Sequence, residues 1–237
     1  MEATPINLPA LFSRATTVLE GQRQALNQAD VLNYNHGDHM VEIFRIATQA
    51  AEEKRGAGMA EAMDCAAGLL GAHPENGSAQ VYARGLAVLA SHFRTRGIEL
   101  DDLLPYVRNY LKEQKEEERQ DPGQKTSGTE VSHAEKPASS GDVLKALLAA
   151  LAEWDRVEAG QLESEQGDKL VSKQGSGLDM GYLFGVGMAY LQAKQKGGDR
   201  LDILSETVVS ASPLGKVPYR HQSGVIAVRS LLEGMNE

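Results

Sequence analysis

The sequence predicts an all-α protein of eight or nine helices. Apolar residues recur three and four positions apart on both sides of one long polar segment, which is the periodicity of helices with one buried face. No window shows the apolar–polar alternation and β-branched enrichment that are typical of strands. The helical segments that this pattern defines have lengths normal for globular proteins and are joined by short polar connections.

Five helices are expected before the polar segment. They cover residues 8–26, 40–53, 59–70, 79–93 and 100–111. The first follows Asn7, a side chain that caps helix N-termini well, and has Pro9 in its first turn, where a missing N–H costs nothing. The second is amphipathic through Val41, Phe44 and Ala47.

Four more helices are expected after the polar segment, at residues 143–154, 178–192, 201–210 and 225–235. The segment itself, residues 112–142, is acidic and rich in Pro, Gly and Ser, and Val131 is its one sizeable aliphatic residue. Such a composition cannot bury enough apolar surface to offset its ordering entropy. We therefore expect one domain over residues 1–237, with 112–142 as a flexible acidic linker between its two helical halves.

The bulk composition excludes several classes of protein. The chain has 237 residues with 24 Lys and Arg against 33 Asp and Glu, so its net charge of −9 argues against general nucleic-acid binding. No apolar run is long enough to span a membrane, and residues 1–14 do not resemble a signal peptide. The single Cys65 excludes an internal disulfide and a cysteine-based zinc site. We expect a cytoplasmic protein.

A polar cluster lies between the first two expected helices and is predicted to form the loop that joins them. It contains Asp30, His36, Gly37, Asp38 and His39. The two carboxylates suit a hard cation such as Mg²⁺, whereas two inward-pointing imidazoles would shift the preference towards Zn²⁺ or Mn²⁺. The alternative is a polar interhelical turn in which one of the aspartates caps a helix.

Residues 26–40, which include Gly37-Asp38-His39, resemble the metal loop of the nucleotide-binding L subunit of dihydroxyacetone kinase and of its relative, the nucleotide domain of fatty-acid kinase. Three further segments are similar to motifs of that family and occur in the same order. They are residues 76–82, 167–169 and 211–215, the last followed by His221-Gln222. The resemblance spans about residues 8–235.

This resemblance implies an antiparallel helical barrel or bundle of about eight helices, with a nucleotide site built from interhelical loops at one end. It implies that Asp30, His36 and Asp38 hold Mg²⁺. It also implies a set of contacts to ADP or ATP, made by His39, Gly77, Ser78, Ser210, Ser223 and Gly224. In this family the phosphate acceptor is held by another subunit, so a substrate-binding partner is expected, and a homodimer is a further expected assembly.

The departures from the family pattern fall on nucleotide contacts. His36 occupies the position of a third metal-binding carboxylate, and Ser210 stands where the family has an arginine that faces phosphate. Lys216, Arg220 and His221 form a small basic group that either replaces this arginine or belongs to an ordinary exposed loop. Such losses are typical of a diverged or inactive copy.

Three functions follow as hypotheses. The first is a Mg²⁺-dependent ADP- or ATP-binding protein that takes part in phosphoryl transfer to a small hydroxy substrate held by a partner. The alternative is a catalytically inactive helical module for protein interaction or nucleotide sensing. The third is a metal-dependent phosphatase in which Asp38 and His39 act with a bound water.

Overall fold

The structure is a computed structural model, and it describes residues 7–99, 102–103, 105, 140–166 and 180–236. These residues form eight α-helices and one short 3₁₀ helix, and they contain no strand, which confirms the predicted all-α class. The elements are α1 (Leu8–Ala29), α2 (His36–Glu53), α3 (Met59–Gly71), α4 (Gly77–Arg96), α6 (Ser140–Gln166), α7 (Met180–Lys196), α8 (Arg200–Ser210), η1 (Pro213–Lys216) and α9 (Pro218–Asn236).

The contacts between helices form a closed ring. Helix α1 lies between α2 and α9, α2 also contacts α3 and α4, and α4 contacts α6. The ring closes because α6 reaches η1, which packs against α9. This arrangement brings the beginning of α9 next to the beginnings of α2 and α4, although these segments are far apart in the sequence.

Side-chain caps mark the starts of α1 and α4. The side-chain oxygen of Asn7 accepts a hydrogen bond from the backbone N–H of Ala10 at 3.3 Å, as the sequence predicts. Asn76 does the same for Ala79 at 2.9 Å, and it starts α4. Helix α4 ends at Arg96, and Gly97 caps it with a φ of 61°, in the left-handed region that glycine adopts at low cost.

The main core lies between α1, α2, α3 and α4. Leu19 and Leu26 of α1 and Met40 of α2 are fully buried there, because each helix turns its apolar stripe inward. A second core joins α4 and α6, where a Cβ atom on Gly85 would lie 2.6 Å from the ring of Trp154. The two helices can approach this closely only because residue 85 has no side chain.

Several element bounds differ from those predicted. Helix α2 begins at His36 rather than residue 40, and α9 begins at Pro218 rather than residue 225. Helix α6 is longer than the predicted 143–154 and includes residues 140–142, which the sequence pattern places in the linker. The rest of the linker and most of the helix predicted at 100–111 lie outside the described residues.

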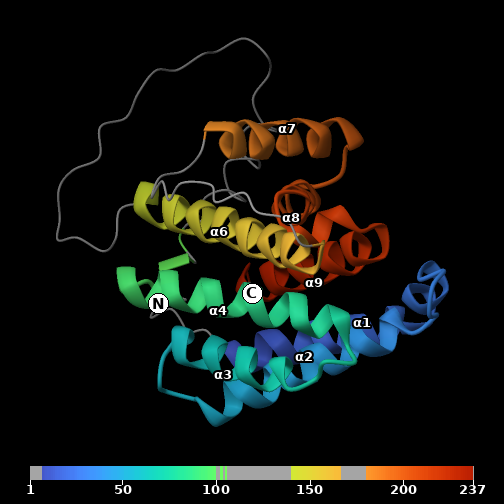
Figure 1. The fold of residues 1–237 in the computed structure, drawn as a ribbon. Helices are drawn as coiled ribbons and strands as arrows, with labels where there is room; N and C mark the ends of the chain where they lie inside the picture. The colour runs from blue at the N-terminus through green and yellow to red at the C-terminus, as the bar shows by residue number, and fades with distance from the viewer. Residues whose placement is uncertain (1–6, 100–101, 104, 106–139, 167–179, 237) are drawn as a thin grey trace.

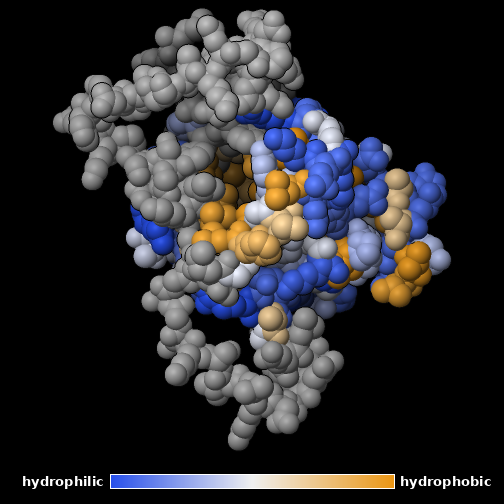
Figure 2. Space-filling model, turned by 90° about the horizontal axis from the view of Figure 1, so that it is seen from above, coloured by the Kyte–Doolittle hydropathy of each residue, from blue (hydrophilic) through white to orange (hydrophobic). Residues whose placement is uncertain are grey.

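Helix α7 is the outermost helix of the bundle in Figure 1, where it packs mainly on α8. Its large apolar side chains are unusually accessible, with Phe184 72% and Leu191 50% exposed, together with Met188 and Tyr190. Apolar atoms accordingly gather on the face seen in Figure 2. No helix among the described residues combines the length and the apolar character that crossing a membrane requires.

Candidate phosphate-binding site

The predicted loop around the polar cluster is shorter than expected, because its second half is helical. His36, Gly37, Asp38 and His39 form the first turn of α2, and only residues 30–35 connect it to α1. Asn35 precedes the helix but gives it no side-chain cap.

The cap of α2 comes instead from the neighbouring helix. The side-chain oxygen of Asn27, in the last turn of α1, accepts hydrogen bonds from the backbone N–H groups of Gly37 at 2.7 Å and Asp38 at 3.2 Å. These are N–H groups that lack a partner within α2 itself. A cap that lies on another helix leaves no local signal, which is why the sequence placed the start of α2 too late.

Asp30 closes the turn between α1 and α2. Its carboxylate is 3% exposed and accepts hydrogen bonds from the backbone N–H groups of Leu32 at 3.1 Å and Asn33 at 3.4 Å. Its backbone carbonyl accepts a third from Tyr34, whose φ is 56°. Asp30 therefore stabilises this turn. This role is close to the polar interhelical turn that the sequence offered as the alternative to a metal site.

Asp38 has different partners from Asp30. Its Oδ2 accepts a hydrogen bond from the side-chain amide of Asn27 at 3.0 Å, and its Oδ1 lies 3.6 Å from the guanidinium of Arg23. The side chain is 52% exposed, and His39 beside it is half-buried. Within the described part of the chain, no group of three or more His, Cys, Asp or Glu side chains is arranged to hold a metal ion. The residues as placed do not fit the Mg²⁺ site, which stays a prediction of the sequence.

His36 is the centre of a buried hydrogen-bonded chain. Its ring is 1% exposed, its Nε2 lies 2.8 Å from Oγ of Ser223 on α9, and its Nδ1 lies 3.5 Å from Oγ of Ser78 on α4. The Ser223 hydroxyl donates to the backbone carbonyl of Arg220 at 3.0 Å, so its oxygen is free to accept the Nε2–H of His36. The ring of Tyr219 packs edge-on against the imidazole at 4.7 Å.

This environment keeps His36 neutral. Burial lowers its pKa from 6.5 to about 4, and the positive charges of Arg220 and His39 act in the same direction against the opposing effect of Asp30. A neutral imidazole donates at one nitrogen and accepts at the other, which matches its two serine partners. His36 therefore joins α2, α4 and α9 at one end of the bundle.

The start of α4 belongs to the same end of the molecule. Asn76 caps it and also donates to a carboxylate oxygen of Glu42 at 3.1 Å, and Ser78 is 4% exposed. Gly77 is the first residue of α4, and a Cβ atom there would lie 3.6 Å from Nη2 of Arg220. The guanidinium of Arg220 is thus placed directly beside the N-terminus of α4.

Arg220 has no carboxylate partner among the described residues. Its Nε is buried without a hydrogen-bond acceptor there, and its guanidinium carbon lies 5.7 Å from the ring centre of Tyr219. The buried hydroxyl of Tyr82 also lacks a partner in the described part of the chain. Burial raises the pKa of Tyr82, while the charge of Arg220 acts in the opposite direction. The charge of Arg220 is therefore available to an anion.

The other two members of the predicted basic group are occupied. Lys216 forms an ion pair with Asp155 of α6 at 2.5 Å. His221 lies 3.2 Å from a carboxylate oxygen of Glu206 and 3.3 Å from Oγ of Ser210. The sequence grouped these residues by proximity along the chain, but only Arg220 is directed towards α4.

The remaining predicted contacts have separate positions. Ser210 is exposed at the end of α8, where His221 is its partner. Ser223 and Gly224 are both buried within α9, and a Cβ atom on Gly224 would lie 3.2 Å from Val209. Gly224 is thus a packing residue. Residues 167–169 lie outside the described part of the chain.

The site therefore combines Ser78, Gly77, Arg220, His36 and Ser223, from the starts of three helices. The sequence missed Tyr219, which no local pattern marks. Tyr82 ends the segment 76–82 that resembles a family motif, but that pattern does not mark its hydroxyl, which has no hydrogen-bond partner among the described residues. No family model, no curated protein and no solved structure matches the chain. The likeness to the L subunit of dihydroxyacetone kinase thus rests on the short motifs of the sequence.

Proposed function

We propose that the chain binds the phosphate groups of a nucleotide, ADP or ATP, where α2, α4 and α9 begin. The single observation that carries this proposal is the guanidinium of Arg220, which lies beside Gly77 at the start of α4 and has no acidic partner among the described residues. A half-buried cation in that position gains most from a ligand that brings negative charge.

The start of α4 adds to the attraction of an anion. Helix N-termini carry partial positive charge and present backbone N–H groups, and they commonly bind phosphate. Arginine suits the same ligand because its planar group can donate two hydrogen bonds to one phosphate. In this proposal Arg220 takes the role of the family arginine that Ser210 has replaced, but it does so from α9.

A more specific form of this proposal is that the bound nucleotide takes part in phosphoryl transfer to a small hydroxy compound held by a partner subunit. This form rests on the resemblance of the short motifs. Nucleotide sensing without turnover is the alternative, and the geometry favours it. Asp30 accepts hydrogen bonds from its own turn, and Asp38 from Asn27, so both carboxylates already have protein partners. These hydrogen bonds occupy part of the acceptor capacity of both carboxylates and would compete with a metal ion for it.

Calorimetric titration of the full chain tests nucleotide binding. ADP and ATP are each titrated in the presence of Mg²⁺ and again with a chelator, on the wild-type chain and on Arg220→Gln. The expected result is binding that Arg220→Gln weakens by about 10- to 100-fold, the value of one charge-assisted contact. A requirement for Mg²⁺ would support the kinase-like form of the proposal, and binding with the chelator would support nucleotide sensing.

Arg55→Gln is the matched control. It removes the same charge beyond the far end of α2, about 25 Å from His36 along the helix. Its affinity for nucleotide is expected to equal that of the wild type. Absence of binding at millimolar nucleotide, or equal weakening by Arg220→Gln and Arg55→Gln, would overturn the proposal.

A second candidate function, association of two copies, is favoured by the apolar side chains of α7. Phe184, Met188 and Leu191 follow helical spacing and are 72%, 41% and 50% exposed. We propose that this face binds the same face of a second chain.

Sedimentation of the wild type should show a dimer. The double variant Phe184→Ser with Leu191→Ser should dissociate it. The control Leu32→Ser changes a position in the α1–α2 turn that is as exposed as Phe184, and it should leave the dimer intact. A monomeric wild type would contradict this.

A further inference from the structure

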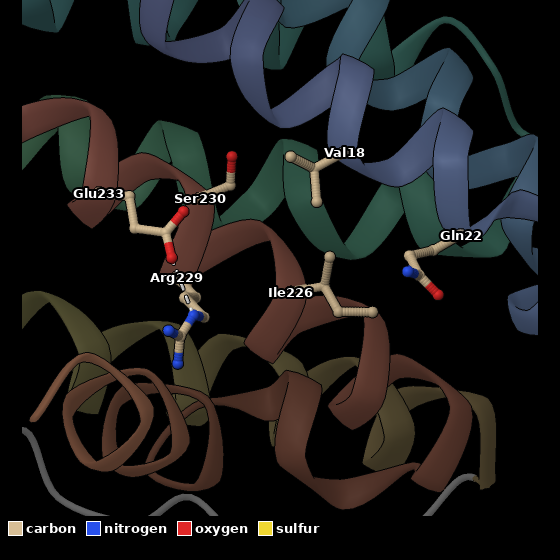
Figure 3. Close-up of a pocket in the computed structure, with 6 residues that line it drawn as sticks. All are labelled: Val18, Gln22, Ile226, Arg229, Ser230 and Glu233. Carbon is tan, nitrogen blue, oxygen red and sulfur yellow. Dashed lines mark hydrogen bonds and ion pairs between the residues drawn. The ribbon is translucent and has the colours of Figure 1, made fainter. Parts of the chain in front are cut away.

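A cavity of about 200 Å³ lies between α1 and α9, separate from the proposed phosphate site. We propose that it binds a small uncharged molecule that has an apolar body and one hydrogen-bonding group. Val18 and Gln22 of α1 form one wall, and the other wall comes from residues of α9 (Figure 3). These α9 residues are Ile226, Arg229, Ser230 and Glu233.

The hydroxyl of Ser230 provides the first argument. Ser230 is 2% exposed, and its Oγ has no hydrogen-bond partner among the described residues. Leaving a buried hydroxyl without a partner costs about 1–3 kcal/mol. The Oγ atom is shielded from solvent in this conformation, so its side chain would have to rotate toward the cavity before a ligand hydroxyl or carbonyl could pair with it and recover this free energy.

The apolar part of the cavity provides the second argument. Val18 and Ile226 point toward one another from opposite helices in Figure 3. Val18 is 37% exposed, so the cavity is open to solvent on the α1 side. An apolar ligand between these two side chains would remove their surfaces from water, which is favourable.

The charged groups of the cavity are already neutralised. Arg229 binds Glu233 at 2.9 Å and Asp199 at 2.9 Å, and it also contacts Asp202. Glu233 has a second partner in Arg14. An ionised ligand would therefore have to compete with existing ion pairs, whereas an uncharged ligand leaves them intact.

The volume of the cavity suits a ligand of about one ring. An engineered apolar cavity of about 150 Å³ is known to hold benzene, so a cavity of about 200 Å³ suits a ring with one polar substituent. Phenol is a suitable probe, toluene has similar size without the hydroxyl, and benzoate adds a charge.

The test records the methyl NMR resonances of Val18 and Ile226 in the full chain during titration with each probe. Phenol should shift both resonances at millimolar concentration, toluene should bind at least about fivefold more weakly, and benzoate should leave them unchanged. The variant Ser230→Ala should lose the preference for phenol over toluene. In Arg220→Gln, which alters the phosphate site, phenol binding should be unchanged.

Two further variants, Val18→Phe and Ile226→Phe, fill the cavity from opposite walls, and either should abolish the binding of both neutral probes. Thermal unfolding of each variant shows whether it is folded. If one variant does not fold, the other still tests whether filling the cavity abolishes binding. The proposal is overturned if phenol leaves both methyl resonances unchanged, if Ser230→Ala binds phenol as well as the wild type does, or if benzoate binds as tightly as phenol.

Discussion

The Nε2 atom of His36 lies 2.8 Å from Oγ of Ser223, which is 187 positions later in the sequence. This contact joins the first turn of α2 to α9, and Ser78 extends it to α4 through the other ring nitrogen at 3.5 Å. Because Ser223 also donates to the carbonyl of Arg220, the imidazole sets the position of the segment that carries the proposed anion-binding side chain.

The stability of the protein should fall as His36 is forced to take up a proton. The pKa of His36 is about 4 in the folded chain, and we take its ordinary value of 6.5 for the unfolded chain. Between pH 4 and pH 6.5 the unfolded chain therefore binds a proton that the folded chain does not. The free energy of unfolding should therefore decrease by about 3 kcal/mol from this residue as the pH falls from 6.5 to 4. Below pH 4 this contribution changes by less than about 0.5 kcal/mol.

Urea unfolding of the wild type and of His36→Gln at several pH values measures this effect. The difference in unfolding free energy between them should shrink as the pH falls, because glutamine does not titrate. The ring resonances of His36 give the pKa directly. A midpoint near 6.5 in the folded protein would show that the ring is not buried as described.

Asn27 should contribute to stability through the start of α2. Asn27→Ala removes the acceptor for Gly37 and Asp38 and the donor to the Asp38 carboxylate, and we expect a loss of about 1–2 kcal/mol. The exposed neighbour Gln28 is the control, and Gln28→Ala should change stability by less than about 0.5 kcal/mol. Equal effects in chemical denaturation would rule out the cap.

Two glycines should respond to alanine in opposite directions. A Cβ atom on Gly37 would collide with the backbone carbonyl oxygen of Arg23, so Gly37→Ala should separate α1 from α2 and cost about 2 kcal/mol or more. Around Gly68 in α3 there is no atom within 4 Å of such a Cβ. Gly68→Ala should stabilise the chain by about 1 kcal/mol, because alanine favours a helix interior. Thermal unfolding of both variants distinguishes these outcomes.

Arg84 of α4 and Glu158 of α6 should be energetically coupled. They form two hydrogen bonds of 2.6 and 3.0 Å, and their side chains are 29% and 12% exposed. A double-mutant cycle with Arg84→Gln and Glu158→Gln should give a coupling of about 1–2 kcal/mol. The pair Arg55–Glu52 has side chains that are 61% and 49% exposed and should give less than about 0.5 kcal/mol. Similar couplings for the two pairs would contradict this prediction.

The sequence predicted the helical fold more completely than the site. Local signals such as Asn7 before Pro9 gave the start of α1 correctly, because a cap and its partner lie within one turn. The start of α2 was wrong by four residues, because its cap is Asn27 on another helix. The start of α9 was placed seven residues late, at residue 225 instead of Pro218, because polar residues open that helix.

Among the candidate site residues, His36 and Ser78 are brought together, whereas Ser210 has a different partner and Asp30 closes a turn. The sequence alone determined the helical class and the buried face of α2, because apolar periodicity is a local property of the chain. Only the tertiary structure decided that His36 meets Ser223 and that Arg220 lies beside Gly77. Such pairings depend on how separate helices pack, and no local pattern encodes that geometry.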